Sequence, residues 1–312
     1  MADSGLSQPI RVATRRSQLA LTQSRQVAAA LAAASGARVE LVEVTSEGDV
    51  NDGPLRHIGG TGVFVTAVRQ ALTDGRADVA VHSLKDLPTA ADPGFLLAAV
   101  PAREDFRDAL CARGRMLADL PLGAHVGTGS PRRAAQLLLL RPDLEIADLR
   151  GNVDSRLARV GQDLDAVVLA AAGLARLGRL ADASELFGLQ AMLPAPGQGA
   201  LAVEVAVDAP PALARAVAEL DDPATRVCAT AERTLLAALE AGCSAPVGAV
   251  ATVSEPGYWE PEIFLQAGVF SPSEAVRMSL TGSAGAADEL GRELASQLLA
   301  AGAAEIMRES TL

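Results

Sequence analysis

The chain has few cysteines, few aromatic residues and no long apolar run. Its three cysteines, Cys111, Cys228 and Cys243, are too widely spaced to form a disulfide framework. Aromatic residues make up only 3% of its 312 residues, so the hydrophobic cores must be built from Ala, Leu and Val. No apolar run reaches the roughly 18 residues that a membrane-spanning helix needs, so we expect no contact with a membrane.

The sequence also lacks the patterns of a metal site and of a secreted protein. Its three histidines are scattered and no Cys/His set has zinc spacing, so we expect no metal ion. Residues 1–8 show no basic region followed by an apolar stretch, so we expect no signal peptide and a cytoplasmic protein. The formal net charge of −11 argues against nonspecific binding to nucleic acid.

Arginine is nevertheless concentrated in the middle of this acidic chain, at Arg132, Arg133, Arg150, Arg156, Arg159 and Arg176. Exposed charges more than about 8 Å apart are screened at physiological ionic strength, so distant acidic groups oppose such a cluster only weakly. The pattern indicates either a local anion-binding site or solvated helix faces, and both interpretations stay open at this point.

Alternating strand and helix patterns predict an α/β fold with helices on both faces of its sheets. In the first part we predict strands at 10–14, 38–45, 79–81 and 95–100, and helices at 17–34 and 63–73, with a glycine-rich loop at 48–62. The pattern then repeats, with strands at 125–127, 145–149 and 166–170, and helices at 131–140, 153–160 and 171–180. The last part is typical of a small α+β domain, with helices at 222–241 and 286–301 and strands at 247–253, 262–269 and 277–281.

Two features mark the domain boundaries. Charge density rises sharply over 101–108, and the run rich in Pro and Gly over 193–199 is the strongest linker signal. One strand cannot form a domain alone, so we expect the strand at 201–205 to return to the first domain. The predicted domains are 1–102 with 198–220, an inserted domain at 103–197, and 221–312, and the paired crossings favour a hinge.

The run Val-His-Ser-Leu-Lys-Asp-Leu-Pro over 81–88 places Lys85 and Asp86 side by side after an apolar strand. Open α/β sheets place ligand chemistry at such strand ends. Asp86 is a candidate general acid or stabiliser of a cation, and Lys85 is a candidate Schiff-base lysine or anion ligand. A plain Lys-Asp turn without chemistry is the alternative interpretation of these two residues.

Three strand-to-helix turns carry arginine, at 14–17, 127–133 and 149–152. In the second turn, Pro131 suits the first helical position, whereas Arg132 and Arg133 oppose the helix dipole. This unfavourable interaction with the helix dipole indicates that a negative group lies nearby. The free N–H groups of a helix start also attract anions. Together the three turns favour a ligand with several carboxylates or phosphates.

Cys243 follows Gly242, which is expected to end a helix, so it should lie on a loop. A thiol there is incidental, a nucleophile or an attachment point, and without a nearby histidine a protease role has little support. Cys111 and Cys228 lie in apolar strand-like and helical segments and are predicted to be small buried hydrophobes.

These motifs coincide in one family, because the chain closely resembles the porphobilinogen deaminases. The matching stretches follow one another through nearly the whole chain: Arg-Val-Ala-Thr-Arg from Arg11, Gly-Val-Phe-Val from Gly62, Val-His-Ser-Leu-Lys-Asp-Leu-Pro from Val81, Gly-Thr-Gly-Ser-Pro-Arg-Arg from Gly127, Leu-Arg-Gly-Asn-Val-Asp-Ser-Arg-Leu from Leu149, Ala-Gly-Leu-Ala-Arg-Leu-Gly from Ala172, Pro-Gly-Gln-Gly-Ala from Pro196, and Ala-Glu-Arg to Gly-Cys from Ala231.

The resemblance implies two doubly wound lobes like those of periplasmic binding proteins, a small α+β C-terminal domain, and a monomer. It implies a transferase of tetrapyrrole (haem) biosynthesis that joins four porphobilinogen molecules head to tail with release of ammonia. The same enzyme then hydrolyses off hydroxymethylbilane. Its primer would be a dipyrromethane cofactor in thioether linkage to Cys243.

By the same resemblance, Asp86 is the catalytic aspartate. The side chains that match cofactor-binding groups are Lys85, Ser83, Thr128, Ser130, Arg132, Arg133 and Arg150. Those that match groups near the substrate and the growing chain are Arg15, Arg156 and Arg176, and Asp49 and Phe64 match positions at the mouth of the site. The chain departs from some relatives at His57 and Thr61, where they carry lysine, and at Gly129 and Pro131.

Two other functions explain parts of the pattern. A noncatalytic two-lobed anion-binding protein accounts for the hinge and the arginines, but not for a third domain with Cys243, and it predicts an export signal. A pyridoxal-phosphate enzyme with Lys85 as its Schiff base would need a phosphate-binding glycine loop, which does not accompany Lys85. Intact mass separates these functions, since a thioether-bound dipyrrole survives denaturation and an imine is lost on hydrolysis.

Overall fold

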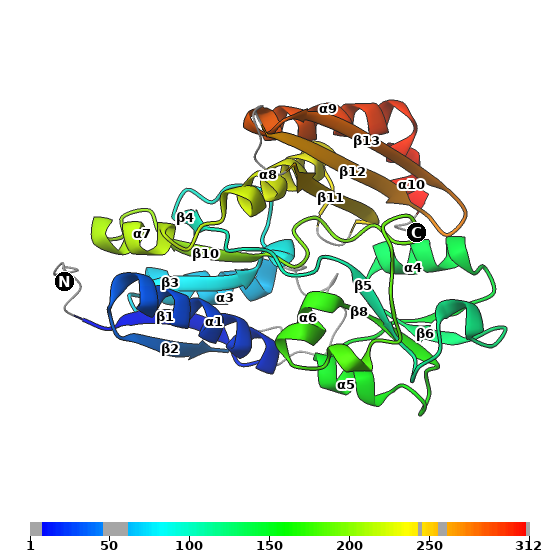
Figure 1. Cartoon of the computed structure of the whole chain (residues 1–312), viewed down its shortest axis with the longest axis horizontal. Coiled ribbons are helices and arrows are strands. Elements are labelled where there is room, and N and C mark those ends of the chain that lie inside the picture. The colour runs from blue at the N-terminus through cyan, green and yellow to red at the C-terminus, as the bar shows by residue number, and fades with distance from the viewer. Residues whose placement is uncertain (1–7, 46–61, 243–244, 255–260, 310–312) are drawn as a thin grey trace. The chain divides into compact units, whose positions relative to one another are not determined.

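The structure is a computed structural model that describes residues 8–45, 62–242, 245–254 and 261–309, without the side chains of 62–64 (Figure 1). It divides into two compact units, residues 1–103 with 200–226 and residues 104–199 with 227–312. Residues 48–61 of the loop predicted at 48–62, with Asp49, His57 and Thr61 among them, and Cys243 lie outside the described residues, and Gly62 begins α3. The division into three domains stays a prediction.

The first unit contains a five-stranded sheet in the order β2-β1-β3-β10-β4. Its strands are β2 (Val39–Val44), β1 (Ile10–Arg15), β3 (Val79–Ser83), β10 (Leu201–Ala206) and β4 (Phe95–Ala99). Strand β1 is parallel to β2 and β3, whereas β10 is antiparallel to both β3 and β4. The strand that follows the linker therefore pairs within the sheet formed by the first part of the chain.

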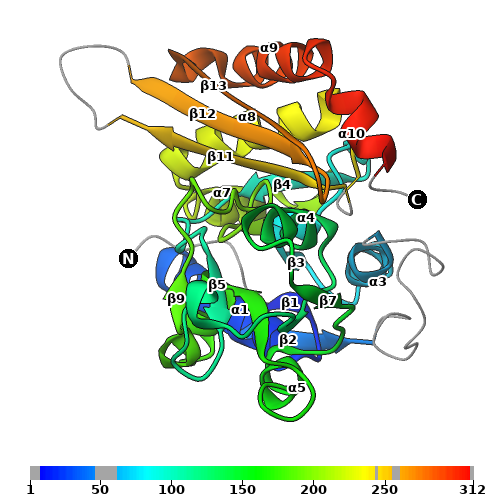
Figure 2. The same cartoon turned by 90° about the vertical axis from the view of Figure 1, so that its right-hand side faces the viewer.

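Helices cover both faces of this sheet, as Figure 2 shows for α1 (Gln18–Ser35) and α3 (Gly62–Thr73). Leu31 of α1 and Val217 of α7 (Pro211–Ala218) belong to the core on one face, and Val68 of α3 to the core on the other. Helix α7 was not predicted, since consecutive prolines look like a turn, although proline is well suited to a first helical position.

The second unit contains a five-stranded sheet in the order β7-β6-β8-β5-β9. Its strands are β7 (Glu145–Ala147), β6 (His125–Gly127), β8 (Ala166–Ala170), β5 (Asp108–Cys111) and β9 (Glu185–Leu186). Strand β6 is parallel to β7 and β8, and β5 is antiparallel to β8 and β9. Helix α4 (Pro131–Leu140) packs on one face, and α5 (Val153–Ala158) and α6 (Ala171–Arg176) pack on the other.

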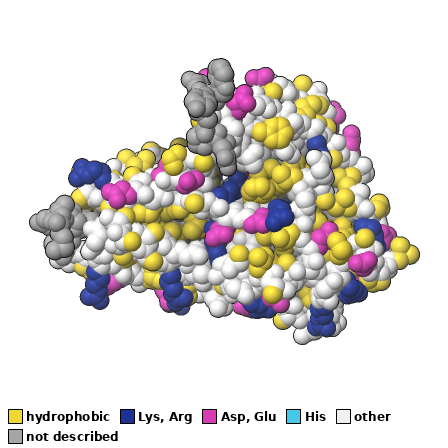
Figure 3. All heavy atoms as spheres, viewed as in Figure 1, with side chains coloured by type: hydrophobic (Ala, Val, Ile, Leu, Met, Phe, Trp, Pro, Cys, Tyr) yellow, Lys and Arg dark blue, Asp and Glu magenta, His cyan; other side chains and the backbone are white. Residues whose placement is uncertain are grey.

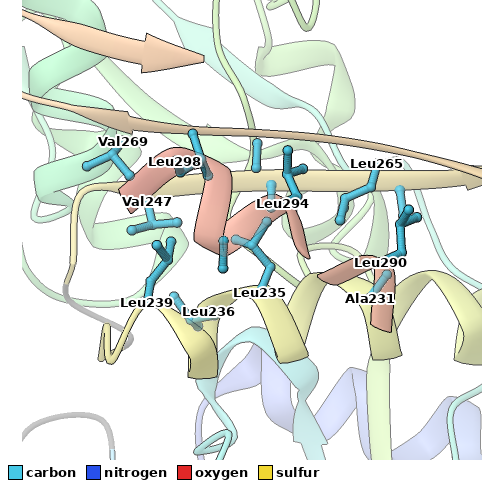
Figure 4. Close-up of a cluster of buried hydrophobic side chains, with 14 of the residues drawn as sticks. Ala231, Leu235, Leu236, Leu239, Val247, Leu265, Val269, Leu290, Leu294 and Leu298 are labelled. Atoms are coloured by element: carbon cyan, nitrogen blue, oxygen red, sulfur yellow. The ribbon is translucent and has the colours of Figure 1, made fainter. Parts of the chain in front are cut away.

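The second unit also contains an antiparallel three-stranded sheet of β11 (Val247–Val253), β12 (Glu262–Phe270) and β13 (Ala275–Ser283). Helices α8 (Pro223–Ala238), α9 (Ala287–Ala300) and α10 (Ala303–Glu309) share one core with this sheet. Figure 4 shows Leu235 of α8, Leu294 of α9 and Leu265 of β12 meeting there. This core contains no aromatic side chain among the described residues, as the composition predicts.

These sheets confirm the predicted fold class, which is α/β with two doubly wound sheets and a small α+β element at the C-terminal end. Cys111 and Cys228 are buried, as predicted. No helix within the described ranges combines the length and the apolarity needed to cross a membrane. On the face drawn in Figure 3, basic and acidic side chains are interspersed rather than gathered into one basic area.

Candidate active site

One edge of the β7-β6-β8-β5-β9 sheet gathers the predicted residues of the second unit. The carboxyl ends of the parallel strands β6, β7 and β8 lead into α4, α5 and α6 at this edge. Strand β5 is antiparallel and begins at the same edge, where Asp108 lies opposite Ala170. The structure therefore brings together the turns and the helices α4, α5 and α6 that carry Thr128, Ser130, Arg132, Arg133, Arg150, Arg156 and Arg176, the last at the C-terminal end of α6.

The turns after β6 and β7 lie directly against each other. The N–H of Thr128 donates to the carbonyl of Ala147 at 2.9 Å. A Cβ atom on Gly129 would lie 2.8 Å from the backbone oxygen of Leu149, closer than real Cβ contacts, so glycine permits this approach. The absence of a side chain at Gly129 is therefore a packing requirement of this chain.

Thr128 and Ser130 present hydroxyl groups at the start of α4. The Ser130 side chain caps the helix by accepting from the N–H of Arg133, and Thr128 Oγ1 accepts from the N–H of Ser130 at 3.2 Å. Neither hydroxyl donates a hydrogen bond to another described residue. Both can therefore donate to a carboxylate of a ligand.

Arg132 and Arg133 are buried and bind the carboxylate of Asp108. Arg132 Nη1 lies 2.7 Å from Asp108 Oδ2, and Arg133 donates from Nε and Nη2 to Oδ1 at 2.9 and 2.7 Å. Burial would raise the pKa of Asp108, but the charges of the two guanidinium groups outweigh that effect and hold it well below its ordinary value. The negative group that the sequence led us to expect beside α4 is thus, in part, a residue of the chain itself.

The other three arginines of this edge differ in burial. Arg176 Nη2 donates to the carbonyl of Gly199 at 2.7 Å, while its Nε is buried without an acceptor among the described residues. Burial lowers the pKa of Arg176 and Glu104 opposes this, but a guanidinium remains protonated. Arg156 is half-buried and donates from Nε to the carbonyl of Gly151 at 2.8 Å. The Arg150 side chain is 37% exposed, and its Nε lies 3.9 Å from Oδ2 of Asp148.

The first unit places its predicted residues at the end of β3 and β1. Ser83 ends β3, and a single 3₁₀ turn, Leu84–Asp86, follows it. Leu84 is buried and its N–H donates to the carbonyl of Ala200 at 3.0 Å, which anchors the turn that carries Lys85 and Asp86. Arg15 is the last residue of β1 and is half-buried.

Asp86 is a half-buried carboxylate with no hydrogen-bond or ion-pair partner among the described residues of the chain. Ser83, in contrast, is held by α1, since Gln23 Nε2 donates to its Oγ at 3.0 Å. An acidic group that the described residues leave unpaired is available to bind a cationic substrate group or to exchange a proton with it.

The structure reveals three polar residues that the sequence analysis did not identify. Asp108 and Gln198 are fully buried, and Gln198 Nε2 donates to Asp108 Oδ1 at 2.9 Å. Gln23 is buried on α1 beside Ser83. The available signals were an aspartate at the start of an apolar strand and glutamines in a linker and on a helix, none of which indicates a partner.

The described residues contain no group of three or more His, Cys, Asp or Glu side chains arranged to hold a metal ion. The Cys111 thiol is buried, and burial raises its pKa to about 12, so it stays protonated and unreactive at neutral pH.

Comparison with known proteins identifies the family to which the chain belongs. Residues 10–213 match the family model described as porphobilinogen deaminase, dipyromethane cofactor binding domain, and residues 226–300 match the model of its C-terminal domain. The porphobilinogen deaminase of Leifsonia xyli is 51% identical over 95% of this chain and 94% of its own. Porphobilinogen deaminase 1 of Streptomyces coelicolor is 53% identical over 96% of this chain and 98% of its own.

A solved structure of a nutrient-binding protein from Burkholderia cenocepacia bound to methionine is similar over 67% of this chain and 89% of its own. The TM-score is 0.42 and the identity 17%. The family models together cover most of the chain, and the relatives are far above 30% identical over nearly its full length. The chain belongs to the porphobilinogen deaminase family.

Proposed function

We propose that this chain joins four porphobilinogen molecules head to tail on a dipyrromethane primer attached to Cys243 and releases hydroxymethylbilane. Family membership supports the reaction, and the arginine-rich edge of the second unit supports the class of ligand. The observation that carries the proposal is the buried pair Arg132 and Arg133, beside hydroxyl donors and at the start of a helix. Catalysis by Asp86 and the roles of the other site residues are part of this proposal.

The residues of the second unit fit a group with acetate and propionate side chains. Two buried guanidinium groups face one buried carboxylate, so the cluster keeps an excess positive charge. The hydroxyls of Thr128 and Ser130 and the buried Nε of Arg176 are further donors without acceptors among the described residues. Charge-assisted hydrogen bonds contribute roughly 1.5–3 kcal/mol each, enough to offset the desolvation of carboxylates. When bound, the dipyrromethane supplies the pyrrole carbon at which the chain is extended.

Asp86 is proposed to act on the aminomethyl group of porphobilinogen. Its carboxylate would hold the ammonium form of that group and stabilise the cationic pyrrole that remains when the carbon–nitrogen bond breaks and ammonia leaves. When the new carbon–carbon bond has formed, the same carboxylate would accept the proton lost from the attacked pyrrole carbon. The same carboxylate would therefore act twice in each addition, first beside the ammonium group that leaves and then as the acceptor of the proton from the attacked carbon.

Arg15, Arg150, Arg156 and Arg176, with Lys85 and Ser83, are proposed to bind carboxylates of the substrate, the primer and the growing chain. Guanidinium groups suit this task because they bind carboxylates in two-point geometry and stay charged. Arg150 and Arg156 are less buried than Arg132 and Arg133, which suits contacts that change as the chain grows. We also propose that the protein acts as a monomer in the cytoplasm.

The test is incubation of the purified protein with porphobilinogen. We expect intact mass to show a covalent dipyrrole and stepwise additions of single pyrrole units, with four ammonia molecules released per hydroxymethylbilane formed. Cys243→Ser should carry no covalent pyrrole. A protein that forms hydroxymethylbilane without any sulfur-linked pyrrole would contradict the proposal.

A further inference from the structure

Asp108 is fully buried at the first position of β5 and accepts hydrogen bonds from three side chains. Arg132 binds Oδ2, whereas Arg133 and Gln198 bind Oδ1, all at 2.7 to 2.9 Å. The arginines lie in the first turn of α4, and Gln198 lies in the segment that leads to β10. One carboxylate thus fixes the orientation of two guanidinium groups.

The charges in this cluster do not balance. The side chains of Arg132 and Arg133 are only 4% and 7% exposed, and Asp108 is their sole ion-pair partner among the described residues. One positive charge is therefore left over beside the start of α4, where the helix dipole is also positive. Burying such a charge is costly unless an anion accompanies it, so the cluster is set up to receive one.

Further hydrogen bonds from Arg132 and Arg133 to backbone carbonyls also fix the orientation of the two guanidinium groups. Arg132 Nη1 also donates to the carbonyl of Leu193 at 2.5 Å, and Arg133 Nη1 donates to that of Val168 at 3.1 Å. These contacts leave each guanidinium little freedom to turn. Without the carboxylate, two like charges would face each other in the interior and move apart.

The same carboxylate anchors two of the three segments at which the chain passes from one unit to the other, near residues 104 and 199. Gln198 Nε2 binds Asp108 and also donates to the carbonyl of Phe106 at 2.8 Å. The carbonyl of the next residue, Gly199, accepts from the N–H of Glu104 at 3.3 Å and from Arg176. Loss of the Asp108 charge would therefore disturb the arginines and these two connecting segments together.

We propose that Asp108 is a positioning residue, which holds Arg132 and Arg133 in the orientation that binds carboxylates of the dipyrrole primer. The inference rests on the proposed function. Because Asp108 is fully buried, we place it behind the two arginines and not in contact with substrate or primer. It acts through the two arginines, and its removal should impair attachment of the primer more than the folding of the chain.

The experiment compares apo-proteins produced in a host that cannot make porphobilinogen. Asp108→Asn keeps the shape and removes the charge. Glu204→Gln is the matched control, since Glu204 is also a buried carboxylate paired with an arginine, in the other unit. Each protein is unfolded with heat, and a second sample is incubated with porphobilinogen while intact mass follows the appearance of the covalent dipyrrole.

We expect both variants to lose thermal stability, but only Asp108→Asn to acquire the dipyrrole at least tenfold more slowly than the unmodified protein. Equal loading rates in the two variants would show a purely structural role and overturn the inference. If Asp108→Asn does not fold, Asp108→Glu tests the inference instead. This variant keeps the negative charge, but its side chain is longer by one methylene group and would displace the guanidinium groups. It should load slowly, and loading at the unmodified rate would overturn the inference. An unmodified protein that never acquires the dipyrrole would instead contradict the proposed function.

Discussion

Arg69 and Glu204 form a two-point ion pair that joins α3 to β10. Nη2 lies 2.7 Å from Oε1, and Nε lies 2.9 Å from Oε2, although the residues are 135 positions apart. His82 of β3 lies beside the same Glu204 carboxylate, with its Nε2 3.2 Å from Oε2. Burial would raise the pKa of Glu204, but the bonds from Arg69 and the neighbouring His82 outweigh it and lower the pKa to about 2.

This pair predicts how stability depends on pH. Because the pKa of Glu204 is lower in the folded chain than its ordinary value of 4.5, its contribution is complete above pH 4.5 and is lost as pH falls toward 2. One pKa unit corresponds to about 1.4 kcal/mol, so the contribution is on the order of 3 kcal/mol at neutral pH. Urea unfolding of Glu204→Gln at pH 7 and pH 4 should show a deficit that shrinks at the lower pH.

Glu289→Gln is the control, since this carboxylate is exposed on α9. Its effect on the free energy of unfolding should be small. A Glu204→Gln deficit that stays the same from pH 7 to pH 4 would rule out the low pKa of Glu204.

The carboxylate of Asp86 has no partner to lose within the described part of the chain, so its removal should affect turnover and not folding. Asp86→Asn is expected to unfold at nearly the same temperature as the unmodified protein while its kcat falls roughly 100- to 10,000-fold. Rates of ammonia release and thermal unfolding measure the two effects. Near-native turnover would exclude Asp86 as the catalytic acid or base.

Gln23 supports the neighbouring Ser83 from a buried position on α1. In Gln23→Leu the hydroxyl of Ser83 loses this donor, which should cost about 1 kcal/mol of the free energy of unfolding. We also expect a severalfold rise in KM for porphobilinogen, because Ser83 is proposed to help bind carboxylates. Gln18→Leu, on the exposed start of the same helix, should change neither quantity.

Arg156 and Arg159 provide a matched pair around the end of α5. Arg159 is paired with Asp163 in a local ion pair, whereas Arg156 is proposed to bind the growing chain. Arg156→Leu should therefore stall elongation, so that intact mass shows an accumulated intermediate of partial length. Arg159→Leu should give the normal distribution, and identical distributions in both variants would contradict the assignment of Arg156.

Gly291 permits α9 to approach α8 closely. A Cβ atom there would lie 2.5 Å from the carbonyl oxygen of Ala231, in a helix backbone that cannot yield cheaply. We expect Gly291→Ala to reduce the free energy of unfolding by about 1–3 kcal/mol, as measured with urea. Gly188→Ala, where no atom lies within 4 Å of the added carbon, should be close to neutral.

Much of the fold could be predicted from local patterns. The strand at 166–170 and the helix at 131–140 have the predicted bounds, because apolar periodicity and the Pro131 start are local signals. Helix α10 was missed, since a short segment after a helix end has too few turns for its period to show. The helix predicted at 171–180 ends at Arg176, where a new turn and Gly178 with φ of 67° follow.

The candidate site was predictable as a set of residues but not as a network. The motifs identified Asp86 and the arginine-bearing turns, because strand ends followed by polar residues are visible in sequence. The partners Asp108 and Gln23 were not identified, since nothing local connects Asp108 to arginines 24 and 25 residues later, or Gln23 to a serine 60 residues later.

By itself, the sequence determined the α/β class, the order of most of the elements, the family and the residue types at the strand ends. These depend on periodicity and on motifs that each span a few residues. Only the tertiary structure decided that Arg132 and Arg133 are buried on one carboxylate while Asp86 has no partner among the residues that the structure describes. The physical reason is that β5 runs antiparallel beside β8, which brings Asp108 to the edge where α4 begins.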